Sequence, residues 1–151
     1  MHINELLTLD AIIYDAEAAS KKIVLEIISE TAHSFLPSLS QHEIFDKFIE
    51  REQLGSTAIG SGVALPHARV KNNDKTIGVF ISLKQAIDFR ALDGDKVKYF
   101  FALLIPEGST QEHLNVLAAL AKFFRNEENR KKLNNSSSKQ ELYDLLCKIE
   151  Q

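Results

Sequence analysis

The sequence predicts a single α/β domain in which helices cover both faces of a mixed central sheet. Two apolar runs rich in β-branched and aromatic residues, 76–83 and 97–106, lie in the middle of the chain and have the character of interior strands. Segments with helical periodicity precede and follow them. The dipeptide Asp93-Gly94 between the runs predicts a tight, hairpin-like turn, which would make the sheet mixed and not purely parallel.

The first half of the chain predicts one strand and two helices. The short apolar run AIIYD, residues 11–15, is typical of an edge strand. Apolar residues at a helical period predict a helix over 20–35, with its inner face formed by Ile23, Ile27 and Thr31 and by the adjacent Val24 and Ile28.

After Pro37, Ser40 and Glu43 form a capping-box pattern that opens the second helix. Its apolar side carries Ile44, Phe45, Phe48 and Ile49. We expect Gly55 to end this helix in a left-handed conformation.

Three further helices are predicted after the second apolar run. Ser109 and Glu112 form a capping box for a helix whose apolar side comprises Leu114, Leu117, Ala121 and Phe124. A short charged helix over 127–133 follows. Ser138 and Glu141 then cap a last amphipathic helix with Leu142, Leu145 and Leu146 on its apolar side.

Composition narrows the class of protein. The chain has 151 residues, 44% hydrophobic and 26% charged, as expected of one globular domain. A net charge of −3 argues against nucleic-acid binding, which usually needs a basic surface. With a single cysteine, Cys147, and neither a signal peptide nor a membrane-spanning run, we expect a cytoplasmic protein that does not insert into membranes.

The segment GSTAIGSGVALPHARV, residues 55–70, is the most informative stretch for function. It matches no nucleotide-binding motif: Ser61 stands where a P-loop needs lysine, and Leu65 where a dinucleotide fingerprint needs its third glycine. The histidines show no short-range spacing typical of a zinc site. His33 and His42 are predicted to be exposed on helices and are assigned no role.

The segment instead presents His67 on a stiff mount. Pro66 has a fixed φ and pushes Leu65 into an extended conformation, while the nearby glycines allow close backbone approach to an anion. A neutral imidazole mounted in this way is suited to attack a phosphoryl group. Arg51 and His113 are candidates to stabilise the charge. Taken singly, however, residues of these types in such positions are more often structural or surface residues than catalytic ones.

The motif RExxGSTAIGSGVALPHAR, followed by GVFISL, AIDFRALDGDKV, FALLIPE and EHLNVLAALA, resembles the enzyme IIA domains of the phosphoenolpyruvate-dependent phosphotransferase system. The resemblance is to the fructose–mannitol–nitrogen group and is nearest to the nitrogen-regulatory type. It extends from about Leu7 to Leu146, so we expect one domain over 1–151. One departure is Ala68-Arg69, where the nitrogen type often has Gly-Lys.

The resemblance implies the mannitol-type IIA fold, with a sheet of about five strands, and no metal or nucleotide cofactor. It implies that His67 is phosphorylated on Nε2 by an HPr-like phosphocarrier, that Arg51 balances the phosphate charge, and that His113 is the second active-site histidine. A hydrogen bond from Nδ1–H of His67, for example to a backbone carbonyl, would leave Nε2 free.

Three function classes remain open from the sequence. The first is a regulatory phosphoryl acceptor that binds target proteins according to its phosphorylation state. The second is a sugar-specific IIA that passes phosphate to an enzyme IIB domain. The third is an interaction module without phosphorylation, against which the intact Arg51, His67 and His113 argue.

Overall fold

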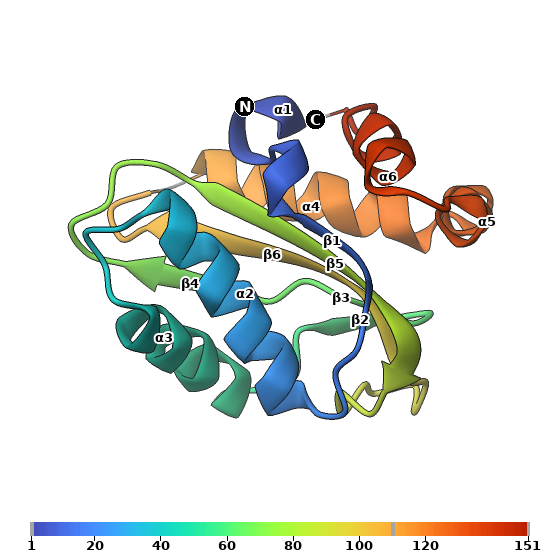
Figure 1. The fold of residues 1–151 in the computed structure, drawn as a ribbon, viewed down its shortest axis with the longest axis horizontal. Helices are drawn as coiled ribbons and strands as arrows, with labels where there is room; N and C mark the ends of the chain where they lie inside the picture. The colour runs from blue at the N-terminus through green and yellow to red at the C-terminus, as the bar shows by residue number, and fades with distance from the viewer. Residues whose placement is uncertain (1, 110, 151) are drawn as a thin grey trace.

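A mixed six-stranded sheet lies between two layers of helices in the computed structural model, which describes residues 2–109 and 111–150 (Figure 1). The strands are β1 (Ile12–Ala16), β2 (Ala58–Gly60), β3 (Val63–Ala64), β4 (His67–Val70), β5 (Ile77–Ile87) and β6 (Val97–Pro106). The helices are α1 (Ile3–Leu6), the 3₁₀ helix η1 (Leu9–Ala11), α2 (Lys21–Phe35), α3 (Gln41–Gln53), α4 (Gln111–Arg125), α5 (Glu127–Asn135) and α6 (Lys139–Leu146).

The strand order is β1-β5-β6-β3-β2, and β4 also pairs with β6. β1 runs parallel to β5, β5 antiparallel to β6, and both β3 and β4 parallel to β6. β3 pairs with Tyr99 and Phe100, and β4 pairs with residues 103–106 farther along β6. β3 and β4 thus pair with β6 one after the other and can be viewed as one strand interrupted at Leu65-Pro66, which reconciles the expected five strands with the observed six.

The predicted α/β class, the mixed sheet, the interior strands and the edge strand are confirmed. β5 and β6 lie inside the sheet, and alternate side chains of each enter different cores. Phe80 and Phe101 belong to the core beneath α4 and α6, whereas Ile81 and Phe100 belong to the core beneath α2 and α3. Strands buried on both faces need apolar residues at successive positions, which explains why neither run alternates.

Helices α2 and α3 begin where predicted, because Ser20 and Ser40 accept hydrogen bonds from the backbone N–H groups of Ile23 and Glu43. The predicted inner face of α2 is partly wrong. Ile23 is 38% exposed, and the buried residues are Val24, Leu25, Ile28, Ser29 and Ala32. The surface strip of α2 that carries Ile23 and the strip that carries Val24 and Ile28 are both apolar, and packing against the sheet determines which of the two is buried.

The predicted apolar side of α4 is also partly wrong. Phe124 is buried as predicted, but Leu114 is 54% exposed, and the other buried residues are His113, Val116 and Leu120. The predicted capping box at Ser109 and Glu112 depends on Thr110, which lies outside the described residues. The charged helix α5 is confirmed, as is α6, where Ser138 accepts from Glu141 N–H and Leu142, Leu145 and Leu146 are buried.

The connection between β5 and β6 is longer than a two-residue hairpin. It runs through residues 88–96 and contains the predicted turn, in which Gly94 N–H donates to the Ala91 carbonyl at 3.0 Å. The Asp93 carboxylate accepts from the backbone N–H groups of Ser61 and Asp95, each at 3.0 Å. The turn therefore holds the β2–β3 turn in place, although Ser61 and Asp93 are 32 residues apart in the sequence.

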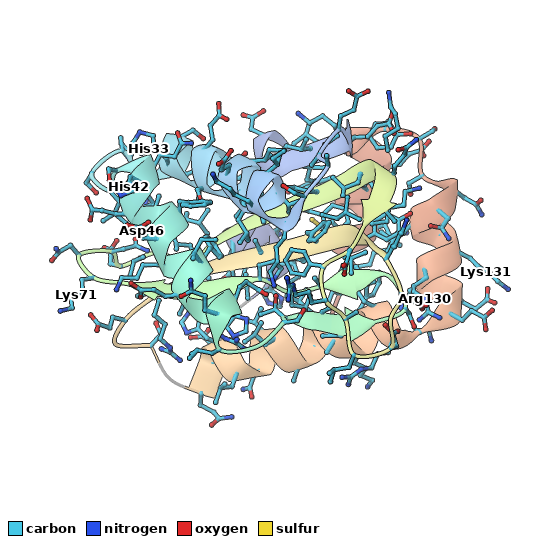
Figure 2. The ribbon with its side chains drawn as sticks, turned by 90° about the horizontal axis from the view of Figure 1, so that it is seen from below. His33, His42, Asp46, Lys71, Arg130 and Lys131 are labelled. Carbon is cyan, nitrogen blue, oxygen red and sulfur yellow. The ribbon has the colours of Figure 1, made fainter. Side chains whose placement is uncertain are left out.

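Two smaller predictions need correction. Gly55 has a φ of +152°, which is positive but far from the left-handed helical region near +57°. His42 is exposed as predicted, but His33 is half-buried, with Nδ1 2.6 Å from the Leu39 carbonyl, because the loop after Pro37 folds back over it. Figure 2 shows these two histidines at the same end of the molecule.

Candidate active site

The glycines before His67 form a tight hairpin between β2 and β3. Ser61 and Gly62, the two residues of the turn, have φ values of +57° and +81°. Positive φ at both positions is typical of a type I′ turn, which favours glycine because it lacks a Cβ. Gly62 is therefore required by the turn, and the segment returns directly towards β6.

Leu65 and Pro66 hold the backbone on the N-terminal side of His67. Leu65 N–H donates to the Thr57 carbonyl at 3.0 Å, and the Pro66 carbonyl accepts from Leu103 N–H at 2.9 Å. β4 begins at His67, which pairs with Leu103 of β6. The stiff mount predicted for His67 is thus built from backbone hydrogen bonds on both sides of the proline.

The imidazole of His67 is held in one tautomer. Its Nδ1 lies 2.9 Å from the Leu65 carbonyl oxygen, which can only accept a hydrogen bond. Nδ1 therefore carries the proton, and in the neutral ring Nε2 keeps its lone pair. Arg51 Nε lies 3.4 Å from Nε2 and donates to it, in agreement with that assignment.

Arg51 reaches His67 from the last turn of α3. Its Nη1 also donates to the Gly55 carbonyl at 3.1 Å, so the guanidinium connects the helix end to the glycine segment. Burial of the ring and the Arg51 charge lower the pKa of His67, opposed by the Leu65 carbonyl and the Glu52 carboxylate. A lowered pKa keeps the imidazole neutral and nucleophilic into mildly acidic pH.

His113 lies in the first turn of α4 and is 6% exposed. Its Nε2 is 2.5 Å from Thr76 Oγ1, and its Nδ1 is buried with no hydrogen-bond partner among the described residues. Burial lowers its pKa. In this conformation Thr76 occupies one ring nitrogen and the protein covers the other, so contact between His113 and a ligand requires the side chain to rotate.

Arg51, His67 and His113 line one surface hollow of about 440 Å³ between α3, β4 and α4. The three predicted site residues come from distant parts of the sequence and are brought together. The hollow also holds residues that the sequence analysis did not select: Lys47, Glu50, Leu54, Arg69, Glu107, Leu114 and Leu117. For Arg69 a signal existed, since it lies two residues after His67 in a strand and so shares its face.

A second group of residues supports the end of α3. The Glu52 side chain is 3% exposed, and its Oε2 lies 2.8 Å from Lys21 Nζ on α2. Glu52 also accepts hydrogen bonds from the backbone N–H and the hydroxyl of Thr57. These contacts fix the residue next to Arg51 against α2 and the start of the glycine segment.

No helix in the described ranges is long and apolar enough to cross a membrane. Within the same ranges, no group of three or more His, Cys, Asp or Glu residues is arranged to hold a metal ion.

Comparison with known proteins agrees with the fold. A nitrogen regulatory protein of Bradyrhizobium diazoefficiens is 36% identical over 147 residues, which cover 97% of this chain and 95% of the relative. The crystal structure of the nitrogen regulatory protein IIA-Ntr from Neisseria meningitidis superposes with a TM-score of 0.91 at 39% identity, covering 95% and 98% of the two chains.

Sugar-specific relatives are more distant. A fructose-specific EIIA component of Haloferax volcanii is 29% identical over 97% of this chain and 96% of its own. Mannitol IIA of Escherichia coli, solved in complex with phosphorylated IIB, shares the fold with a TM-score of 0.75 at 20% identity, over 93% and 96% of the chains.

The family described as phosphoenolpyruvate-dependent sugar phosphotransferase system, EIIA 2, matches residues 5–149, nearly the whole chain. With this match, the 36% identity to a nitrogen regulatory protein and the shared fold, the chain belongs to the EIIA 2 family of the phosphotransferase system.

Proposed function

We propose that the protein is a phosphoryl-accepting IIA that takes a phosphoryl group from an HPr-like phosphocarrier onto Nε2 of His67. The observation that carries the proposal is the tautomer of His67. Nδ1–H donates to the Leu65 carbonyl, and Nε2 accepts from Arg51 in a hollow open to solvent. An imidazole with its proton fixed on one nitrogen offers the other as a nucleophile.

In the transfer, Nε2 of neutral His67 attacks the phosphorus atom held by a histidine of the carrier. The new N–P bond forms as the carrier's N–P bond breaks, with the two nitrogens roughly in line. The carrier imidazole leaves with the electron pair of the broken bond. The proton stays bound to Nδ1 of His67 throughout and remains hydrogen-bonded to the Leu65 carbonyl oxygen.

Arg51 has two effects on this step. Its positive charge disfavours protonation of His67, and it stabilises the phosphoryl oxygens, across which charge spreads during transfer. Since Arg51 Nε already lies 3.4 Å from Nε2, only a small shift would bring it onto a phosphoryl oxygen. His113 is the second histidine of the proposed site and would turn from Thr76 to contact the phosphoryl group.

We favour a regulatory role for the phosphorylated form. Phosphorylation would add about −1.5 to −2 charges to the surface of the hollow, enough to change which proteins bind there. The similarity to nitrogen regulatory proteins supports this reading and, with it, a cytoplasmic setting. The alternative is transfer to an enzyme IIB domain, supported by the fructose-specific relative and by the mannitol IIA–IIB complex. A module that has lost phosphorylation would have no need for the aligned Arg51 and His67.

The test is incubation with phosphoenolpyruvate, enzyme I and candidate carriers, followed by intact mass measurement. We expect one acid-labile phosphoryl group on the wild type and on His42→Ala, a control that removes an exposed histidine of α3. The group should be absent from His67→Ala. Undiminished phosphorylation of His67→Ala would overturn the assignment.

A second experiment separates the two roles. Purified phosphorylated protein is mixed with fructose-type and mannitol-type IIB domains, and the label on each protein is followed. Retention of the phosphoryl group supports the regulatory role, whereas rapid transfer to a IIB domain supports sugar uptake.

A further inference from the structure

Arg69 lies beside His67 in the hollow and has no role in the site as described so far. β4 alternates between outward and inward side chains: Ala68 and Val70 are buried, whereas His67 and Arg69 lie on the other face of the strand. Both His67 and Arg69 line the hollow, together with His113. The arginine is thus neighbour to both histidines.

The guanidinium of Arg69 is tied to the chain that leads into α4. Its Nη1 donates to the Ser109 carbonyl at 2.7 Å and lies 3.5 Å from the Glu107 carbonyl. Among the described residues, Nε and Nη2 have no acceptor, so three of the five N–H groups of the side chain are available to an incoming anion. A guanidinium can hold a phosphate through two parallel hydrogen bonds.

The charges in the hollow also point to Arg69. Lys47 Nζ is 3.5 Å from the Glu50 carboxylate, which partly neutralises it. In the described part of the chain, neither Arg51 nor Arg69 is paired with a carboxylate. A phosphoryl group on His67 would carry about −1.5 to −2 charges, more than one guanidinium balances.

The electrostatics of the two histidines agree with this arrangement. The Arg69 charge contributes to lowering the pKa of His67 and also that of His113. The Arg51 charge, in contrast, is a cause of the lowered pKa for His67 alone.

We propose that Arg69 is a second phosphate-binding residue, which together with Arg51 holds the phosphoryl group on His67 while it remains tied to the segment before α4. This inference rests on the proposed function of His67. The inference also gives phosphorylation a structural consequence. The phosphoryl group on His67 would bind the same Arg69 side chain that contacts the Glu107 and Ser109 carbonyls, so phosphorylation would affect the segment that precedes His113.

The experiment compares Arg69→Gln with Lys71→Gln, which makes the same charge change on an exposed residue outside the hollow. Figure 2 shows Lys71 at the same end of the molecule as His33 and His42. We expect Arg69→Gln to reduce the equilibrium constant for phosphorylation by the carrier about tenfold, as for loss of a hydrogen bond to a charged group at a partly exposed site. Lys71→Gln should match the wild type, and Arg69→Lys should recover part of the loss.

A readout that does not need the carrier is the NMR titration of the ring protons. In Arg69→Gln the pKa of both His67 and His113 should rise, because a neighbouring cation has been removed, and in Arg69→Lys both should return towards the wild type. A purely structural tether would leave the pKa values unchanged. Equal phosphorylation of Arg69→Gln and the wild type, or unchanged titration of both rings, would overturn the inference.

The two proposals fail in different ways. If the wild type itself takes no phosphoryl group from any carrier, the proposed function is wrong, whatever the titration gives. If the wild type is phosphorylated on His67 and Arg69→Gln behaves like Lys71→Gln, only the role of Arg69 is wrong.

Discussion

Replacement of Glu52 by Gln tests whether the end of α3 is held by a buried charge. The substitution keeps the shape of the side chain and one carbonyl oxygen for Thr57, but it removes the negative charge 2.8 Å from Lys21 Nζ. Breaking a fully buried ion pair costs roughly 3–5 kcal/mol. Because the Lys21 side chain is 24% exposed and can be partly rehydrated, we expect a loss of about 2–3 kcal/mol in the free energy of unfolding.

Urea unfolding followed by circular dichroism measures this loss. With a urea dependence of about 2 kcal/mol per M, usual for a domain of this size, the midpoint should fall by about 1–1.5 M. The matched control is Glu50→Gln, in the same helix. Its carboxylate is 3.5 Å from Lys47 Nζ, but both side chains are well exposed, at 64% and 46%, so the loss should be a few tenths of a kcal/mol.

The same variant has an effect at His67. The Glu52 carboxylate raises the pKa of that imidazole, so Glu52→Gln should lower it, and the ring titration measured by NMR should move to lower pH. If Glu52→Gln and Glu50→Gln destabilise the protein equally, the interpretation of Glu52 as a buried anchor is wrong.

Three other predictions concern stability. Because burial lowers the pKa of His67 and His113 below the ordinary value of 6.5, the unfolded chain takes up protons at a higher pH than the folded protein does. The free energy of unfolding should therefore fall as the pH drops below about 6.5, and it should fall less in a variant with both residues changed to Gln. Urea titrations at pH 7.5 and 5.5 would test this. Thr76→Val leaves Nε2 of His113 without its hydrogen-bond partner, so the free energy of unfolding, measured by thermal unfolding, should fall by about 1–2 kcal/mol. Thr76→Ser should remain close to the wild type. Equal losses in both variants would contradict the hydrogen bond. Gly62 has a φ of +81°, so Gly62→Ala should lower the free energy of unfolding by about 1 kcal/mol or more. Gly108→Ala, with open space around its Cβ position, should change it little. The reverse order would contradict the turn geometry.

The sequence was sufficient for most of the elements and for their layers because their signals are local, although α1 and η1 were not predicted. Ser20, Ser40 and Ser138 cap the helices that they were predicted to open, and the two apolar runs became the interior strands. It was not sufficient for the buried faces of α2 and α4. Each helix has two neighbouring apolar stripes, and only the position of the sheet decides that Val116 is buried and Leu114 is exposed.

The site shows the same division. His67 could be selected from its proline and glycines, whereas Arg51 and His113 were only candidate charge-stabilising residues until the family resemblance implied their roles. Their meeting in one hollow depends on how α3, β4 and α4 pack, which no local pattern encodes. Thr76, the hydrogen-bond partner of His113, lies 37 residues before it in the sequence, and no sequence pattern indicated this contact.

The interruption between β3 and β4 has a consequence for how this protein can vary. The proton of the His67 ring is positioned by the carbonyl of residue 65, a main-chain atom that every amino acid possesses. Mutation of the Leu65 side chain can alter packing but cannot delete that acceptor. A point substitution at residue 65 should therefore leave the Nδ1–H tautomer of His67 unchanged. Substitutions that change the backbone path can alter this tautomer, and replacement of Pro66 is the most direct of them.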